Sequence, residues 1–335
     1  MMSQPPFRVF LGRTEPSDAA SLDARMSEAL GHIRIDRFLS ASTRVMLKPN
    51  FTWPHHKPGV TTSPAFLESV VKHLRQWTRH ITIVESNGGA NAWPAERAFE
   101  GHGVPEICRA YDVACANFTM LPRERATTVI DGRETTVELA SAALHECDLF
   151  VTLPVPKLHV MTGISLALKN QWGCLPDVRR LRNHPQFRHK ILAINKLLRT
   201  RVALFDGTWF LDRTGPLDGD AVPMNLLIAS DDPGAGSRVV CDLMGVDPAT
   251  VPHKKLAMKV GMLPRGLEGI DLNAPLELFR GHRFRLRRTM LNHVTVGAFH
   301  SRVGTWFLYN SVFAKPLHEA LYLIRGRPKD VNPYW

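Results

Sequence analysis

The stretch RVMLKPNFTWPHHKPGVTTSPAFLESVVKHLRQWTRHITIVES, residues 44–86, places a helical pattern between two apolar segments. Residues 44–50 are apolar and end near Pro49, which has no N–H to donate to a neighbouring strand. Residues 63–77 begin with Ser-Pro, a favourable helix start, and continue with apolar residues at helical spacing. Residues 81–86 are again apolar and β-branched. The stretch predicts a strand, a helix and a second strand, which form the βαβ unit of a parallel sheet.

The same alternation continues on both sides of this unit. Further strands are predicted at 7–12, 147–157, 201–207 and 224–230, and further helices at 17–33, from 104, at 189–200 and at 234–245. Residues 127–139 predict a hairpin that turns at Asp131-Gly132. We expect an α/β fold with a mostly parallel sheet, helices on both faces, a β-hairpin insertion and a C-terminal helical extension. The predicted domains are residues 1–265, with the active-site crevice, and the extension 266–335.

The extension is basic and rich in aromatic residues. Five apolar residues in it are predicted to share one helical face: Val296, Phe299, Val303, Trp306 and Phe307. Two interpretations stay open. The extension is either a helical pair packed on the domain, or a peripheral contact with an anionic membrane surface through residues 279–325.

The charge of the chain predicts an anionic partner. Its 42 basic residues exceed its 31 acidic ones and give a formal charge of +11. Much of the excess lies in residues 181–190 and 279–288. No helix-turn-helix, zinc-finger or ribonucleoprotein pattern accompanies it, so no specific nucleic-acid partner is expected.

Other classes of protein find no support in the sequence. No run of eighteen uncharged apolar residues and no signal-peptide core is present, which predicts a cytoplasmic location. The five cysteines do not form a C-x-x-C pair, so we expect free thiols and neither a zinc nor an iron–sulfur site. The glycine-rich nucleotide motifs and the G-x-S-x-G hydrolase elbow are also absent. The cofactor, if one is used, stays unknown.

Polar residues follow several predicted strands at their carboxyl ends. They are Lys48, Asn50, Glu85, Ser86, Asn87, Lys157 and Asp206. In parallel sheets ligands bind beyond these ends, so we expect one crevice there. An unpaired buried ammonium group is costly, which predicts an anion near Lys48 and Lys157. That anion is either a carboxylate of the protein itself or a substrate.

The segment PKLHVMTGISLALKNQWG, residues 156–173, predicts the centre of the site. Read as a helix from about residue 159, it places His159, Thr162, Ser165 and Lys169 on one face. The predicted catalytic residues are Lys157, His159 and Lys169, with no metal ligands. The predicted substrate-binding residues are Lys48, Asn50, Thr62, Thr162, Ser165, Asn170, His184 and Asp206. Each residue could instead have a purely structural role. His159 could be a core histidine, Lys169 a lysine at a helix end, and His184 part of a solvated loop.

Four motifs resemble the domain of unknown function 362 family: VMLKPN, GVTTSP, PKLHVMTGISLALKNQWGCLP and LFDG. The matching positions are Lys48, Pro49, Asn50, Thr61, Thr62, Pro64, Pro156, Lys157, His159, Lys169, Asn170, Gly173 and His184. The resemblance covers about residues 8–265 and implies the fold more than a reaction. Ser63 replaces a histidine common in the family, and the cysteine-rich ferredoxin-like module of many relatives is missing.

The sequence leaves three hypotheses for function. The first is an enzyme that acts on a small carboxylate- or phosphate-bearing substrate through lysine and histidine acid–base and electrostatic catalysis, in an isomerase-like, lyase-like or reductive reaction. The second is a membrane-peripheral binding or scaffold protein that uses the basic, aromatic C-terminus. The third is an oxidoreductase with a bound or partner-supplied redox cofactor, for which a visible absorption spectrum is the direct test.

Overall fold

The computed structural model describes residues 7–15, 18–89, 92–314 and 316. Its strands are β1 (Phe7–Arg13), β2 (Val45–Pro49), β3 (Ile81–Glu85), β4 (Ala114–Asn117), β5 (Arg123–Ile130), β6 (Arg133–Ala140), β7 (Leu149–Leu153), β8 (Lys157–His159), β9 (Gly163–Ser165), β10 (Thr200–Asp212), β11 (Asp220–Ser230) and β12 (Ile270–Leu272). Its α-helices are α1 (Ala19–His32), α2 (Pro64–Leu74), α3 (Ala95–Glu100), α4 (Val104–Tyr111), α5 (Ser141–His145), α6 (Ala167–Asn170), α7 (Phe187–Leu197), α8 (Pro233–Leu243), α9 (Pro252–Lys259), α10 (Met290–His300) and α11 (Arg302–Asn310). Short 3-10 turns are η1 (Ile35–Arg37), η3 (Gln171–Cys174), η4 (Arg180–Gln186), η5 (Pro248–Thr250) and η6 (Leu276–Phe279).

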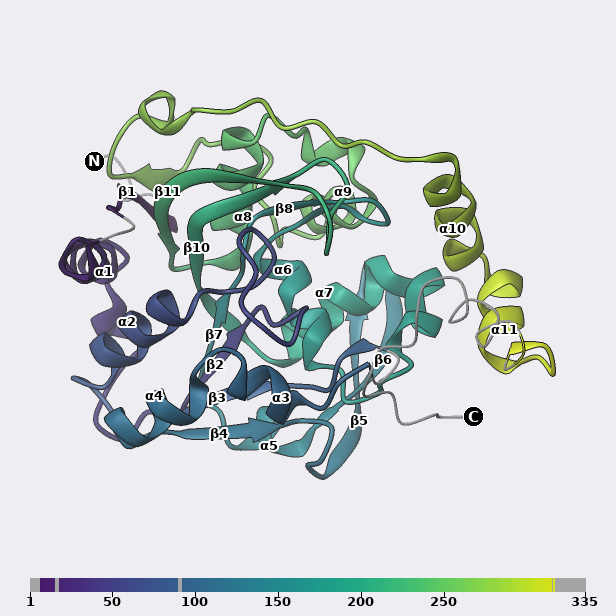
Figure 1. Ribbon diagram of the computed structural model, residues 1–335, viewed down its shortest axis with the longest axis horizontal. Coiled ribbons are helices and arrows are strands. Elements are labelled where there is room, and N and C mark those ends of the chain that lie inside the picture. The colour runs from purple at the N-terminus through teal and green to yellow at the C-terminus, as the bar shows by residue number, and fades with distance from the viewer. Residues whose placement is uncertain (1–6, 16–17, 90–91, 315, 317–335) are drawn as a thin grey trace.

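The described strands form a ten-stranded sheet, in which β8 and β9 lie off the main path, and a separate β5–β6 hairpin (Figure 1). The order along the main path is β12-β1-β11-β10-β7-β2-β3-β4. The pairs from β10 through β7, β2 and β3 to β4 are parallel, whereas β11 runs antiparallel to both β1 and β10. The predicted α/β fold with a mostly parallel sheet is therefore confirmed.

The predicted βαβ unit is present as β2, α2 and β3. The Ser63 hydroxyl accepts a hydrogen bond from the Phe66 N–H at 3.3 Å and caps α2, with proline in its first turn. All five residues of β2 are buried, as expected for a parallel strand covered on both faces. Val45 and Leu47 pack with helices α1 to α4, whereas Met46 packs on the other face with α7 and the β5–β6 hairpin. The strand period of two thus divides its side chains between two layers.

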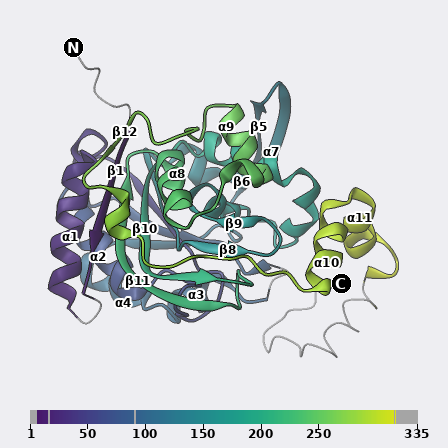
Figure 2. The same ribbon diagram turned by 90° about the horizontal axis from the view of Figure 1, so that it is seen from above.

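The predicted hairpin is also confirmed. β5 and β6 pair antiparallel and are joined by Asp131 and Gly132, with φ angles of 51° and 72°. Two successive positive φ values are typical of the two-residue turn that fits the twist of a hairpin. Figure 2 shows the hairpin projecting beside α7 and α9.

The predicted C-terminal helical extension is confirmed by α10 and α11, but two details of the segment differ from the prediction. β12 pairs with β1, so the predicted boundary at residue 265 precedes a strand of the main sheet. The chain then crosses the domain from η6 to α10 (Figures 1 and 2). The single predicted helical face is wrong, because Ser301 ends α10 and caps α11. As a result Phe299 lies beside His184, while the Val303 side chain is 76% exposed. Residues 315 and 317–335, the rest of the predicted extension and membrane contact, lie outside the described residues.

The helix predicted from residue 159 is wrong as well. Residues 157–159 and 163–165 form the antiparallel pair β8–β9, and the helix α6 comprises only residues 167–170. Gly163 at the turn has a φ angle of 81°, which a right-handed helix does not contain. The polar positions follow the strand period instead. Lys157 lies directly opposite Ser165, and the alternate residues Leu158 and Ile164 are buried in the core.

Candidate functional site

A cavity of about 530 Å³ lies beyond the carboxyl ends of β2 and β3, bordered by the β8–β9 pair and by α6 and η3. Seven predicted site residues, two further strand-end residues and a buried arginine line it: Lys48, Asn50, Lys157, His159, Ser165, Lys169, Asn170, Glu85, Ser86 and Arg180. Trp53, Trp93 and Trp172 contribute aromatic wall. The structure thus brings most of the predicted residues to one place, at the sheet edge where parallel strands present their ligands.

Lys48 and Glu85 form a buried ion pair at the base of this cavity. Lys48 Nζ lies 2.7 Å from Glu85 Oε2 and also donates to the Pro49 carbonyl at 2.7 Å. The Glu85 carboxylate accepts two backbone N–H groups, from Phe51 at 3.2 Å and Ser86 at 3.0 Å. Since each charged group is paired and hydrogen-bonded, this lysine has a counter-charge within the protein.

Lys157 has no carboxylate partner among the described residues. Its Nζ donates to Asn50 Oδ1 and to the Val60 carbonyl, both uncharged acceptors, and its side chain is 1% exposed. Burial lowers the pKa of Lys157 well below its usual 10.5, and the nearby ammonium groups of Lys169 and Lys48 lower it further. A neutral amine has two N–H bonds and one lone pair. Asn50 and Val60 take both N–H bonds, which leaves the lone pair for a guest.

Lys169 lies near the end of α6 and lines the same cavity, and its ammonium group has no hydrogen bond or ion pair to any described residue. Burial lowers its pKa from 10.5 to about 7. Both its charged and its neutral form are therefore populated near neutral pH. A lysine with a pKa near 7 can either donate or accept a proton, and an anion placed beside it raises that pKa.

His159 presents one defined tautomer when neutral. The Met161 N–H donates to its Nδ1 at 3.2 Å, so the ring proton lies on Nε2. Its side chain is 5% exposed, and burial, followed by the charge of Lys169, lowers the pKa of His159 well below 6.5. The ring is therefore neutral in the empty site and offers an N–H donor to a guest.

Asn170 and Ser86 add neutral hydrogen-bonding atoms to the site. Asn170 Nδ2 donates to the Lys48 carbonyl at 3.0 Å and to the Thr152 hydroxyl at 2.9 Å, which fixes α6 to strands β2 and β7. Asn170 Oδ1 and the Ser86 hydroxyl are buried and lack a partner among the described residues. Such atoms gain most from a ligand, because an unsatisfied buried polar group is costly.

Four predicted substrate-binding residues lie elsewhere. The Thr62 hydroxyl joins two strand ends, since it donates to the Leu153 carbonyl and accepts from the Asn50 N–H, both at 2.8 Å. Asp206 accepts from the Ser63 N–H at 2.7 Å, just before α2, and thereby positions that helix. Thr162 and His184 line a second cavity that shares no lining residue with the first. Thr162 faces away because it lies in the turn between β8 and β9.

Two residues that the sequence did not single out as site members contribute to the cavity. Arg180 opens η4 and is 9% exposed, and its Nη2 donates to the Asn87 carbonyl at 2.8 Å. It lies one residue before the basic segment 181–190, which is the signal that could have identified it. At Gly173, a Cβ atom would lie 3.1 Å from Lys48 Nζ and 3.2 Å from Glu85 Oε1. Glycine therefore leaves the room that the buried ion pair occupies.

Metal binding has no support in this arrangement. Within residues 7–15, 18–89, 92–314 and 316, no three His, Cys, Asp or Glu side chains group closely enough to hold an ion. The five cysteines are free thiols, and Cys174 beside the cavity is buried.

Comparisons with known proteins place this site in a family. The chain is 26% identical over 282 residues to "Thylakoid-associated protein sll1697" of Synechocystis sp., covering 81% of this chain and 85% of the relative. It is 28% identical over 136 residues to "UBX domain-containing protein 3" of Schizosaccharomyces pombe, covering 41% of this chain and 30% of that protein. A solved protein from Thermotoga maritima gives a TM-score of 0.37 at 12% identity, over 63% of this chain and 55% of that one. The family model described as "Domain of unknown function (DUF362)" matches residues 45–242, which include the strand ends and the whole segment from Lys157 to Gly173, and the chain belongs to this family.

Proposed function

We propose that the chain is an enzyme that binds a small carboxylate- or phosphate-bearing substrate in the cavity at the strand ends. The observation that carries this proposal is the imbalance of charge there. Lys48, Lys157, Lys169 and Arg180 line the cavity against one carboxylate, that of Glu85. Because Glu85 pairs with Lys48, a guest anion would be the remaining counter-charge for Arg180 and for protonated Lys169.

The side chains support a proton transfer in this cavity. Lys157 is the base in the proposal, because burial lowers its pKa and the amine, once neutral, keeps a free lone pair beside the guest. It would take a proton from a substrate carbon next to a carboxylate or carbonyl group, and the electron pair of the broken C–H bond would move to oxygen. The Nε2–H of His159 and protonated Lys169 would stabilise that oxyanion. Such a step is common to isomerisation and elimination reactions.

Calorimetric titration tests the binding part of the proposal. We expect inorganic phosphate or malonate to bind the full chain, and Lys169→Met to weaken this binding at least tenfold, because it removes an unpaired cation. Lys255→Met, at an exposed lysine of α9, is the matched control and should bind as the wild type does. The proposal is wrong if neither anion binds the wild type, or if the Lys169 variant binds both unchanged.

Isotope exchange tests the catalytic part. A panel of small 2-oxo acids in D₂O should incorporate deuterium at C3 in the presence of the wild-type protein. Lys157→Ala and His159→Ala should abolish this exchange while the circular dichroism spectrum stays native. If both variants unfold instead, these residues are core elements and the catalytic roles are wrong.

A contact with an anionic membrane surface is the second candidate function. It is supported by exposed apolar side chains on and around α10 and α11: Met290 84%, Val294 67%, Val303 76%, Trp306 57%, Phe307 42%, Val312 86% and Phe313 59%. Five arginines precede these helices, at 280, 283, 285, 287 and 288. Aromatic side chains beside arginines suit the interface of an anionic bilayer. The Synechocystis relative bears the name thylakoid-associated.

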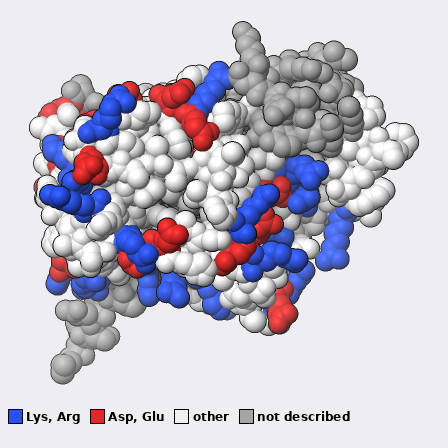
Figure 3. Space-filling model, turned by 90° about the horizontal axis from the view of Figure 1, so that it is seen from below, with Lys and Arg blue, Asp and Glu red and all other residues white. Residues whose placement is uncertain are grey.

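The contact would be peripheral. None of the helices in the described part of the chain combines the length and the apolarity that crossing a bilayer requires. On the face seen from below, Lys and Arg side chains are scattered, with acidic side chains beside many of them (Figure 3). In this candidate, the arginine segment before α10 supplies the electrostatic part of the contact.

Sedimentation with liposomes tests this candidate. The full chain should sediment with vesicles of phosphatidylglycerol and phosphatidylcholine, and less with phosphatidylcholine alone. The triple variant Trp306→Ser, Phe307→Ser, Phe313→Ser should lose most of the binding. Trp77→Ser is the control, because Trp77 is 42% exposed but lies just after α2. Equal sedimentation of the triple variant and the wild type would exclude a role for α11.

A further inference from the structure

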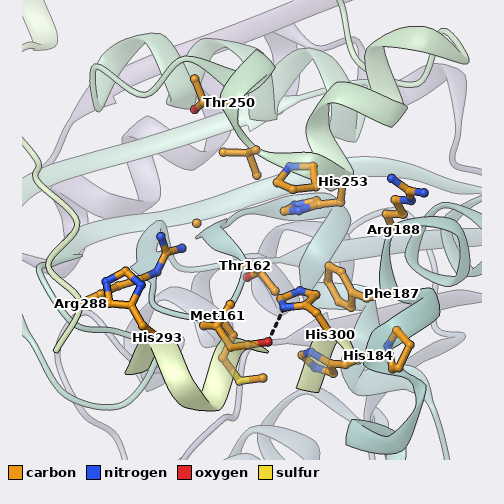
Figure 4. A pocket seen from close by; sticks show the side chains of 15 residues that line it. Met161, Thr162, His184, Phe187, Arg188, Thr250, His253, Arg288, His293 and His300 are labelled. Atoms are coloured by element: carbon orange, nitrogen blue, oxygen red, sulfur yellow. Dashed lines mark hydrogen bonds between the residues drawn. The ribbon is translucent and has the colours of Figure 1, made fainter. Parts of the chain in front are cut away.

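A second cavity, of about 510 Å³, lies between the core and α10 (Figure 4). We call it the histidine pocket, because His184, His253, His293 and His300 all line it. The first two belong to the core, in η4 and α9, and the last two belong to α10. The pocket is therefore complete only with α10 in place. We call the cavity beyond the ends of β2 and β3, which contains Lys48, Lys157 and Lys169, the lysine-lined cavity. The histidine pocket shares no lining residue with it, and the β8–β9 pair lies between the two.

Three polar atoms in this pocket are buried and have no partner among the described residues. They are Thr162 Oγ1, His184 Nδ1 and His253 Nε2. Their side chains are 5%, 4% and 1% exposed, so bulk water does not replace the missing hydrogen bonds. Figure 4 shows His253 on one side of the pocket and Thr162 with His184 on the other. A small hydroxyl group between them would satisfy atoms that folding leaves unpaired.

The two buried imidazoles are neutral. Burial, followed by the charge of Lys169, lowers the pKa of His184 to about 3. Burial also lowers the pKa of His253 well below 6.5, with Lys254 and Lys169 adding to the effect. A neutral imidazole has one donor and one acceptor, which suits a neutral hydroxyl and not a phosphate dianion. His300 Nδ1 donates to the Val296 carbonyl at 2.8 Å, so its Nε2 is an acceptor when the ring is neutral.

The rest of the pocket is apolar, with positive charge and no carboxylate among its lining residues. Phe187, Val251, Pro252 and Val296 form apolar wall, and the Phe187 and His253 ring centroids lie 5.4 Å apart at 82°. An aromatic ring packs well in such surroundings. Arg288 and Arg188 are the charged lining residues. Arg288 is fixed by the bond from its Nε to the Val160 carbonyl at 2.6 Å, which leaves both terminal nitrogens for a ligand.

We propose that the histidine pocket binds a hydroxylated aromatic carboxylate. Its hydroxyl would lie among Thr162, His184 and His253, its ring against Phe187 and the aliphatic wall, and its carboxylate on Arg288. Each part of the ligand matches a separate feature of the pocket. The hydroxyl matches the unpaired buried polar atoms, the ring matches the aromatic and aliphatic wall, and the carboxylate matches a guanidinium group without a carboxylate partner among the lining residues.

Three related probes test this assignment by calorimetric titration of the full chain. 3-(4-Hydroxyphenyl)propanoate carries both polar groups, 3-phenylpropanoate lacks the hydroxyl, and 3-(4-hydroxyphenyl)propan-1-ol lacks the carboxylate. We expect the first to bind at least tenfold more tightly than either of the others. Equal affinities, or no binding by the first probe, would overturn the proposal.

Two single variants locate the binding. Thr162→Val should reduce the advantage of the hydroxylated probe over 3-phenylpropanoate, whereas Arg288→Gln should reduce the advantage of the carboxylate over the alcohol. Arg283→Gln, at an exposed arginine of the same segment, should change neither. Native thermal transitions confirm that the variants fold. A probe that binds both pocket variants as it binds the wild type is held elsewhere, and the proposal is then wrong.

Inorganic phosphate at saturating concentration should not displace the hydroxylated probe, because phosphate is expected in the lysine-lined cavity. Displacement would mean that the probe occupies that cavity instead. The experiment thus separates failure of this proposal from failure of the proposed enzyme function, which does not depend on the probe.

Discussion

Lys48 Nζ and Glu85 Oε2 lie 2.7 Å apart at the ends of two neighbouring parallel strands, and their side chains are 1% and 5% exposed. This pair separates the lysines of the site into two kinds. Lys48 has a counter-charge and several hydrogen bonds within the protein. Lys157 donates two hydrogen bonds to uncharged acceptors, but neither it nor Lys169 pairs with a carboxylate among the described residues, and burial lowers the pKa of each. A guest anion would therefore act mainly on the second kind.

Glu85→Gln should destabilise the fold by about 3–5 kcal/mol, because it leaves the buried Lys48 ammonium unpaired. Urea denaturation at pH 7 measures this change. Glu106→Gln removes the partner of Arg109 in an exposed pair, which solvent screens, and should cost much less stability. If the two variants lose the same stability, the buried pair does not have the structural role described.

Gly173→Ala should weaken phosphate binding and lower stability by about 1–3 kcal/mol. The added Cβ would press on Lys48 Nζ and Glu85 Oε1, which have little freedom to move. Gly31→Ala is a contrasting control in α1, where no atom lies within 4 Å of the new Cβ. It should stabilise the protein by about 0.5–1 kcal/mol, as alanine does in helices. A neutral Gly173→Ala would show that the site accommodates extra volume.

Thr62→Val should lower stability by about 1–3 kcal/mol, because the Asn50 N–H and the Leu153 carbonyl both lose their partner. Thr127→Val, at an exposed cross-strand pair with Thr136, should have little effect. Phosphate binding to folded Thr62→Val, measured by calorimetry, separates the two roles. Unchanged affinity supports a structural role for Thr62, and lost affinity without lost stability would restore it as a binding residue.

The main features of the fold were predictable from local patterns, because βαβ units carry strong signals. The Ser63-Pro64 helix start, the apolar strand β2 and the Asp131-Gly132 turn each depend on a few adjacent residues. The segment from Lys157 to Ser165 is difficult to assign from sequence, because a few polar positions over so short a length fit a helix as well as a strand pair. Gly163 at the turn was the local clue against a helix.

The site was predictable in part. Lys48, Asn50 and Glu85 meet because the parallel strands β2 and β3 end at one edge, a rule that follows from sequence order, whereas Lys157 begins β8. Tertiary packing decided the rest. Thr62 and Asp206 are held by backbone groups distant in sequence, and Arg180 reaches the cavity through a bond to the Asn87 carbonyl. Such contacts leave no periodic signal.

Stability should rise with pH between about 7 and 10.5 through Lys169. Burial lowers its folded pKa to about 7, whereas the unfolded chain keeps the usual 10.5. In this window the unfolded state binds more protons, so raising the pH favours the folded state, by at most about 1.4 kcal/mol per pH unit for one group. Below pH 7 Lys169 is protonated in both the folded and the unfolded state, so it no longer contributes to the slope of stability against pH.

Lys169→Met should reduce the slope of unfolding free energy against pH, as measured by urea titrations at pH 7, 8 and 9. Lys255→Met should leave the slope unchanged. Saturating phosphate should also reduce the slope of the wild type, because an anion beside Lys169 raises its folded pKa toward the unfolded value and draws a proton into the site. Calorimetry in buffers of different ionisation enthalpy should then register proton uptake on binding. A slope that neither the variant nor phosphate changes would mean that Lys169 stays charged in the empty cavity, and that the cavity does not couple anion binding to protonation.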